Sequence, residues 1–177
     1  MTDAIRFPPR VVALDGDDTL WHNETLFSTS HGEFRNLLTR HVDLPGPEID
    51  ARLLATERRN LSLYGYGIKG FVLSMVETAV EVTGGRIPGE DIQAILRVGH
   101  SMLGHPVELI EGAREVLETL RARDHQVWLI TKGDLFDQES KIARSGLVEL
   151  CERIEIVSEK DETTYRRLLV RHGVDPA

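Results

Sequence analysis

The chain has 177 residues, of which 41% are hydrophobic, and this suits one compact domain or a domain that carries a smaller inserted one. With 21 basic and 29 acidic residues the net charge is −8, and no block of Lys and Arg offers a footprint to nucleic acid. The single cysteine, Cys151, excludes an internal disulfide, residues 1–9 lack the apolar core of a signal peptide, and no apolar run reaches membrane-spanning length. We therefore expect a cytoplasmic protein that binds neither nucleic acid nor membrane.

The first predicted strand, residues 10–14, runs directly into the acidic residues Asp15, Asp17 and Asp18. A continuous apolar run of this kind is typical of a parallel strand buried on both faces, and open α/β sheets bind ligands at the carboxyl ends of such strands. Carboxylates about 4 Å apart repel each other by on the order of 4 kcal/mol at an effective dielectric of about 20. A hard cation such as Mg²⁺ relieves this repulsion, so the loop predicts a metal site. The alternative is an ordinary turn before a capped helix.

Residues 22–105 show helical periodicity instead. Apolar residues recur every three or four positions in stretches that Pro or Gly residues separate: 33–42, 49–54, 68–80 and 89–103. We predict that this segment forms an all-helical domain. Residues 61–67, with Tyr64 and Tyr66 beside glycines, interrupt the pattern and suit either a plain connection between helices or a loop or hinge that faces a substrate.

From residue 106 onward, predicted helices alternate with short apolar strands at residues 126–130 and 153–157. Strands separated by helices of this length indicate βαβ units and a parallel sheet. The predicted fold class is therefore α/β, with a Rossmann-like core formed by residues 1–21 and 106–177 and a helical domain inserted at residues 22–105.

The ends of the three predicted strands carry the chemistry. The first ends at Asp15 and Asp17, the second at Thr131, and the third is followed by Lys160. Because parallel strands end at the same edge of a sheet, a carboxylate nucleophile, a hydroxyl donor and a cation are expected to converge there. Thr131, Lys160 and a metal ion would hold the negative charge of a transferring phosphoryl group.

These residues resemble the motifs of the haloacid dehalogenase superfamily. Its first motif, Asp-x-Asp-x-Thr after an apolar strand, is matched by residues 15–19, its second by residues 127–131, and its third-motif lysine by Lys160. The resemblance implies that Asp15 is the nucleophile and a Mg²⁺ ligand, and that Asp17 is the general acid/base whose backbone carbonyl also meets the metal. It also implies that Thr131 is a phosphate donor, that Lys160 is the charge clamp, and that the helical insertion is a cap that excludes water.

The resemblance favours a Mg²⁺-dependent phosphatase that acts on a small phosphorylated metabolite, because the dehalogenases that name the family lack the carboxylate of Asp17. One alternative is a phosphonate hydrolase with a Schiff base on Lys69, the only lysine of the predicted cap. Another is a catalytically impaired member that binds or regulates. Of the remaining lysines, we assign Lys132 to the substrate or phosphate and Lys141 to a solvated helix face.

The family's fourth motif, an acidic pair after a further strand, has no counterpart before Ala177. In the family's sheet order that strand lies beside the first one. We therefore expect the first strand to have an unpaired flank that favours self-association, and we expect this chain to hold Mg²⁺ weakly. Asp18 stands where many members have Gly, and its side chain is expected to cap the following turn.

Overall fold

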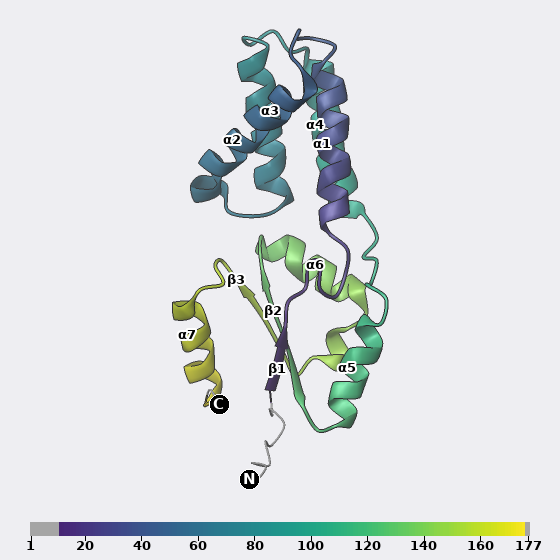
Figure 1. The fold of residues 1–177 in the computed structure, drawn as a ribbon, viewed down its shortest axis with the longest axis vertical. Helices are drawn as coiled ribbons and strands as arrows, with labels where there is room; N and C mark the ends of the chain where they lie inside the picture. Colours follow the sequence, from purple (N-terminus) through teal and green to yellow (C-terminus); the bar gives the residue numbers. More distant parts are fainter. Residues whose placement is uncertain (1–10, 176–177) are drawn as a thin grey trace, which may run out of the picture.

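The structure is a computed structural model that describes residues 11–175, and these form two parts, one above the other (Figure 1). The lower part is an α/β core around a parallel sheet, and the upper part is a set of four helices inserted between the first and second strands. This confirms the predicted α/β class with a helical cap. Arg10, where the first strand was predicted to begin, lies outside the described residues.

The described sheet has three parallel strands in the order β1-β2-β3: Val11–Leu14, Gln126–Lys132 and Arg153–Val157. Leu14 of β1 lies opposite Leu129 of β2, and Lys132 at the end of β2 lies opposite Val157 of β3. The three strands therefore end at the same edge of the sheet, below the cap (Figure 1).

The expectation that the first strand is buried on both faces is wrong for the described residues. Ala13 is exposed and the other residues of β1 are half-buried, because β1 has a partner strand on its β2 side alone among the described strands. The central place belongs to β2, whose residues from Val127 to Ile130 are at most 5% exposed.

Helices cover both faces of this sheet: α5 (Ala113–Ala122), α6 (Leu135–Ser145) and α7 (Glu162–His172), with a 3-10 turn at Val148–Leu150. Leu117 of α5 and Ile142 of α6 pack against Leu129 on one face. Leu168 of α7 packs against Trp128 and its neighbours on the other. Alternate residues of β2 thus face opposite layers, as a strand's period of two requires.

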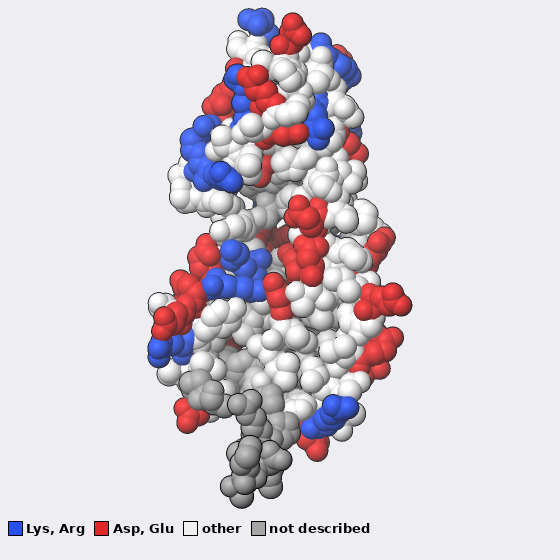
Figure 2. Space-filling view, in the orientation of Figure 1, with Lys and Arg blue, Asp and Glu red and all other residues white. Residues whose placement is uncertain are grey.

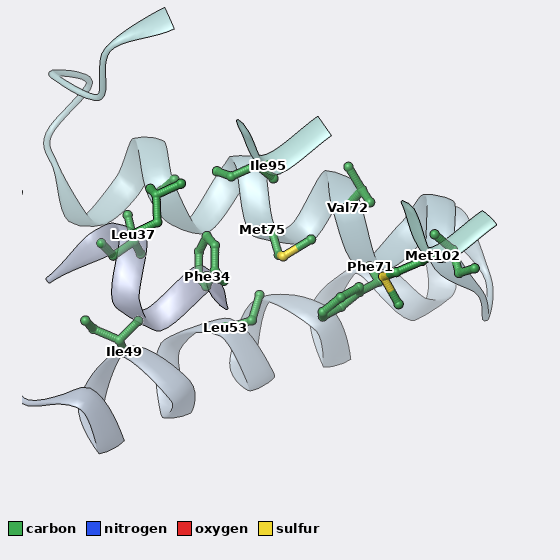
Figure 3. Packing of buried hydrophobic residues seen from close by; sticks show 12 residues of the cluster. Phe34, Leu37, Ile49, Leu53, Phe71, Val72, Met75, Ile95 and Met102 are labelled. Atoms are coloured by element: carbon green, nitrogen blue, oxygen red, sulfur yellow. The ribbon is translucent and has the colours of Figure 1, made fainter. Parts of the chain in front are cut away.

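The cap consists of α1 (Glu24–Leu38), α2 (Gly46–Tyr64), α3 (Ile68–Val82) and α4 (Gly89–Gly104). Side chains from all four helices meet in a cluster separate from the clusters of the core (Figure 3). Phe34, Leu53, Met75 and Ile95 lie within it at 0 to 2% exposure. Each such side chain contributes about 1.5–3 kcal/mol by burial, so the cap has an apolar core of its own.

Two cap helices differ from their predicted extents. α1 begins at Glu24 rather than near residue 33, because its first two turns carry many polar residues and so lack a clear apolar period. α2 continues to Tyr64 through the stretch where a break was expected, and it ends at Gly65, whose φ of 70° suits glycine. None of the helices between residues 11 and 175 is both long and apolar enough to cross a membrane.

Candidate active site

The loop after β1 is packed tightly around Trp21, which is completely buried. A Cβ at Gly16 would lie 2.6 Å from ring carbon Cζ2 of Trp21 and 3.3 Å from the hydroxyl of Thr131. There is therefore no room for a side chain at this position, and glycine allows the loop that carries Asp15 and Asp17 to pack against Trp21 and Thr131.

Asp18 adopts a left-handed backbone conformation, with φ of 56°. Glycine adopts this conformation readily and Asp tolerates it, which explains why either residue suits the position. The Asp18 carboxylate accepts hydrogen bonds from the backbone N–H groups of Asn23 and Glu24 at 2.9 to 3.1 Å. The expected capping role is confirmed, and this carboxylate fixes the start of α1 rather than facing a ligand.

Asp15 and Lys160 meet across the sheet edge in an ion pair between Oδ1 of Asp15 and Nζ of Lys160. The backbone N–H of Gly16 also donates to this oxygen, at 2.7 Å. The second oxygen of Asp15 accepts no hydrogen bond from the described residues, and the side chain is 43% exposed. A carboxylate in this state is accessible to an incoming group and has a cation beside it.

Asp17 is held far more closely. Its two oxygens accept hydrogen bonds from Nε1 of Trp21 at 2.7 Å, Nε2 of Gln138 at 2.9 Å and Nζ of Lys141 at 2.8 and 3.0 Å. The assignment of Lys141 to a solvated helix face is therefore wrong: its side chain is 11% exposed and lies against Asp17. An ammonium group and two neutral donors together fix the position of this carboxylate.

Gln138 links Asp17 to Thr131. Its Oε1 accepts a hydrogen bond from the Thr131 hydroxyl at 3.0 Å, while its Nε2 donates to Asp17. Both Thr131 and Gln138 are at most 2% exposed. The structure thus brings Thr131 to the expected edge, but its hydroxyl is already donated to Gln138, and binding a phosphate through it requires that this hydrogen bond break.

Gln138 and Lys141 were not identified from the sequence, although one signal pointed to them. They lie on the inner face of α6 with the buried Ile142, and a polar residue on an apolar helix face requires a buried partner. Asp137 on the same helix is 4% exposed, and its carboxylate lies 3.4 Å from Lys141. Burial raises the pKa of Asp137 above its ordinary value, and the ammonium of Lys141 opposes that rise.

The cap contacts the site through the turn between α2 and α3 and through the first residues of α3. The ammonium of Lys132, which follows Thr131, lies 3.7 Å from the centroid of the Tyr66 ring, and Lys69 forms an ion pair with Asp134 at 2.9 Å. Burial alone would raise the pKa of Asp134, but the hydrogen bonds from Lys69 and from backbone N–H groups lower it. Figure 2 shows basic and acidic side chains gathered side by side on the core where it faces the cap.

The two linkers that join the cap to the core lie side by side. The N–H of His22 donates to the carbonyl of Glu108 at 2.9 Å, and the N–H of Ile110 donates to the carbonyl of Leu20 at 3.0 Å. The linker that precedes α1 follows directly from the acidic loop. A change in the angle between the cap and the core would therefore shift the backbone next to Asp17.

Between residues 11 and 175 no group of three or more carboxylate, imidazole or thiol side chains comes together as a metal site. The family resemblance implies two oxygen donors for a metal ion at the sheet edge, the Asp15 carboxylate and the backbone carbonyl of Asp17. This limited set fits Mg²⁺, which takes oxygen ligands and is commonly held by one or two carboxylates together with waters and substrate phosphate oxygens.

Comparisons with known proteins agree on one family. Residues 9–177 match the haloacid dehalogenase-like hydrolases. A haloacid dehalogenase-like family hydrolase from Xanthomonas campestris is 47% identical, with a TM-score of 0.88 over 98% of this chain and 72% of that one. No curated protein sequence matches the chain.

Two more distant structures share the fold. A predicted phosphoglycolate phosphatase from Haemophilus somnus is 14% identical, with a TM-score of 0.56 over 94% of this chain and 72% of its own. The L-2-haloacid dehalogenase from Xanthobacter autotrophicus with chloropropionic acid covalently bound is 16% identical, with a TM-score of 0.55 over 96% of this chain and 67% of its own. Because one is a phosphatase by name and the other a dehalogenase, the shared fold does not choose between these reactions.

Proposed function

The chain belongs to the haloacid dehalogenase-like hydrolase family, and from this premise we propose that it hydrolyses a small phosphomonoester through an aspartyl-phosphate on Asp15. One observation carries the proposal: an accessible carboxylate paired with Lys160 lies two residues before a second carboxylate, Asp17, that nitrogen donors hold in place. The first carboxylate suits a nucleophile, and the second suits a proton carrier.

In the first step an oxygen of Asp15 attacks phosphorus, and the bond between phosphorus and the leaving oxygen breaks. Lys160 offsets the charge of the phosphoryl group, and Asp17 gives its proton to the departing alkoxide. In the second step Asp17 takes a proton from water, the water oxygen attacks phosphorus, and the bond to Asp15 breaks. The products are an alcohol and inorganic phosphate, and Asp15 and Asp17 return to their starting states.

Asp17 can carry a proton only if its present hydrogen bonds change. In the structure it is an acceptor from Trp21, Gln138 and Lys141, so no donor position faces the sheet edge. Substrate that draws the Thr131 hydroxyl toward its phosphate would break the hydrogen bond from Thr131 to Oε1 of Gln138, and the Gln138 amide would then be free to turn its Nε2 away from Asp17. The network therefore couples phosphate binding to the position of the acid.

Mg²⁺ is part of the proposal. Asp15 and the Asp17 carbonyl would hold it, and when bound it would neutralise phosphoryl charge as the nucleophile approaches. The charge of the attacking carboxylate and that of the phosphate repel each other, and Lys160 by itself offsets only one unit.

The role of Asp17 favours a phosphomonoester over a haloacid. Halide leaves as a stable anion and needs no proton, whereas an alkoxide leaving group does. A carboxylate that three nitrogen donors hold beside the nucleophile therefore has a task in phosphate ester hydrolysis and none in the departure of halide.

A phosphonate hydrolase with a Schiff base on Lys69 is the weaker candidate. That chemistry needs an amine that is free to attack the substrate, but the Lys69 side chain is held in an ion pair with Asp134 and lies 5.4 Å from the Phe136 ring centroid.

The test is a screen of phosphorylated metabolites with Mg²⁺, followed by Asp15→Asn and Asp17→Asn on the best substrate. Asp15→Asn should nearly abolish turnover, and Asp17→Asn should reduce kcat by about 10²- to 10⁴-fold. Asp50→Asn is the control, because this cap carboxylate pairs with Arg35 away from the site. Wild-type activity from Asp15→Asn, or less than a threefold loss from Asp17→Asn, would remove that residue from its role.

A further inference from the structure

We infer that a small cavity in the cap, where Glu57 lies beside the aromatic rings of Tyr66 and Phe71, receives an ammonium group of the substrate. The preferred substrates would then be aminoalkyl phosphates. This inference rests on the proposed phosphatase function, because it assigns the leaving group of that reaction.

The cavity lies between α2, the turn that follows it and the start of α3. It has a volume of about 70 Å³, and Glu57, Asn60, Tyr66, Phe71 and Ser74 contribute side chains to its wall. Since a cavity needs roughly 10–15 Å³ of such space to hold one water molecule, this cavity accommodates a small polar group such as an ammonium or a hydroxymethyl group.

The Glu57 carboxyl in this wall lacks a full partner. Its Oε1 is buried without a hydrogen bond from the described residues, and the nearest cation candidate, Nε2 of His31, is 3.5 Å away. A separation of this length is too great for a well-formed hydrogen bond. The Glu57 side chain as a whole is 24% exposed, so a ligand that donates to its carboxyl group would supply the partner that the protein does not.

The missing partner is a positive charge. Burial, together with the nearby Glu24, raises the pKa of Glu57 to about 7. Burial also lowers the pKa of His31, so this imidazole is mostly neutral at pH 7 and does not offset the carboxylate. A hydroxyl group would donate a hydrogen bond to the carboxylate but leave its charge unbalanced, whereas an ammonium group would donate a hydrogen bond and also balance the charge.

The aromatic walls also suit a cation. Tyr66 and Phe71 present π-systems, and an ammonium over an aromatic face gains about 0.5–2 kcal/mol. Tyr66 already attracts one ammonium, that of Lys132 on the core.

The cavity lies next to the catalytic edge. Its wall residue Tyr66 contacts Lys132, which directly follows Thr131, and a Cβ on its wall residue Gly67 would lie 3.2 Å from Cβ of Asp134. Glu24, whose charge acts on Glu57, donates its backbone N–H to Asp18 in the acidic loop. A short leaving group can therefore reach the cavity from a phosphate held at the sheet edge.

The test compares two substrates of nearly equal size, 2-aminoethyl phosphate and 2-hydroxyethyl phosphate, on the full chain. The wild-type protein should prefer the ammonium compound by about tenfold or more in kcat/KM, and Glu57→Gln should reduce this preference to below about twofold. Glu48→Gln is the matched control on the same helix, because Glu48 pairs with Arg52 on the surface, and it should keep the preference. Equal use of both compounds by the wild type, or a preference that survives Glu57→Gln, would overturn the inference.

Calorimetric titration separates this inference from the proposed function. If neither compound is turned over, the phosphatase proposal fails for them, and the binding constants still decide the cavity's role. Tighter binding of 2-aminoethyl phosphate by about tenfold, lost in Glu57→Gln, supports the ammonium site. Equal binding of the two compounds contradicts it.

Discussion

The cap and the catalytic edge are held together by different kinds of interaction. In the cap, Phe34, Leu53 and Met75 from three helices are buried together, and the free energy that stabilises the cap comes from the apolar area that is removed from water. At the edge, Asp15, Asp17 and their partners are charged groups whose positions depend on individual hydrogen bonds.

This difference between the cap and the catalytic edge predicts which substitutions lower stability and which lower activity. Apolar packing is non-directional, so a change in the cap interior should lower stability and leave the chemistry of the folded molecules intact. The edge depends on direction and distance, so a change there should lower activity while the fold persists. The predictions below test this separation, beginning with the largest expected effect.

The first prediction concerns the cation beside the nucleophile. Lys160→Met should lower kcat/KM by about 10³-fold, because it removes the charge paired with Asp15, and Lys132→Met should lower it by about tenfold. Steady-state kinetics on the best phosphomonoester measure both. A larger loss at Lys132 would exchange the roles of the two lysines.

The second prediction concerns the cap interior. Leu53→Ala should lower the free energy of unfolding by about 2–5 kcal/mol, because Leu53 is 0% exposed, with kcat of the folded protein changed less than about threefold. Leu54→Ala, at a neighbouring position that is 44% exposed, should cost about 0.5 kcal/mol or less. Urea unfolding gives both values, and equal costs would contradict the assignment of the cap core.

The third prediction concerns the network behind Asp17. Lys141→Met should lower kcat by about 10- to 100-fold, because Asp17 loses the ammonium that holds both of its oxygens. Lys141→Arg keeps the charge and should recover part of the loss. Both are assayed at a temperature where circular dichroism shows a folded protein. Activity of Lys141→Met within twofold of wild type would show that Asp17 needs no such support.

The fourth prediction is a pH dependence of cap stability. Glu57 has a pKa of about 7 when folded and 4.5 as its ordinary value, so the folded protein holds this proton more tightly than the unfolded chain. Stability should therefore fall as pH rises from about 4.5 to 7 and stay level above that.

Glu57→Gln should remove about 2 kcal/mol of the difference in unfolding free energy between pH 5 and pH 8. Glu48→Gln is again the surface control and should leave the difference unchanged. Urea titrations at the two pH values measure it, and the same slope in Glu57→Gln and wild type would refute the pKa shift.

Much of the fold could be predicted because its signals are local. β3 was predicted at residues 153–157 and is found there, since an apolar run between turn residues is short-range information. The meeting of Asp15 with Lys160 also followed from the sequence, because parallel strands end at one edge. Two expectations stay predictions: self-association through the β1 flank, and exclusion of water from the site by a helical cap at residues 22–105.

The parts that could not be predicted depend on the reach of single side chains. Gln138 and Lys141 contact Asp17 from 121 and 124 residues away, so their place on the inner face of α6 indicates a buried partner but does not identify it as Asp17. The exposure of β1 depends on which strands flank it, whereas an apolar sequence alone suggested burial on both faces. Sequence periodicity thus located the strand ends, whereas only the structure shows which lysine contacts which carboxylate there.

A single-turnover experiment in H₂¹⁸O tests the central claim, that water attacks phosphorus after Asp15 has taken the phosphoryl group. With enzyme in excess over a phosphomonoester, mass spectrometry of the phosphate and of the peptide that contains Asp15 locates the label. We predict ¹⁸O in the phosphate and none in Asp15. Label in the Asp15 carboxylate would mean that water attacks the carbonyl carbon of the Asp15 intermediate. This happens when the aspartate forms an ester with a carbon atom of the substrate, and the result would contradict the account.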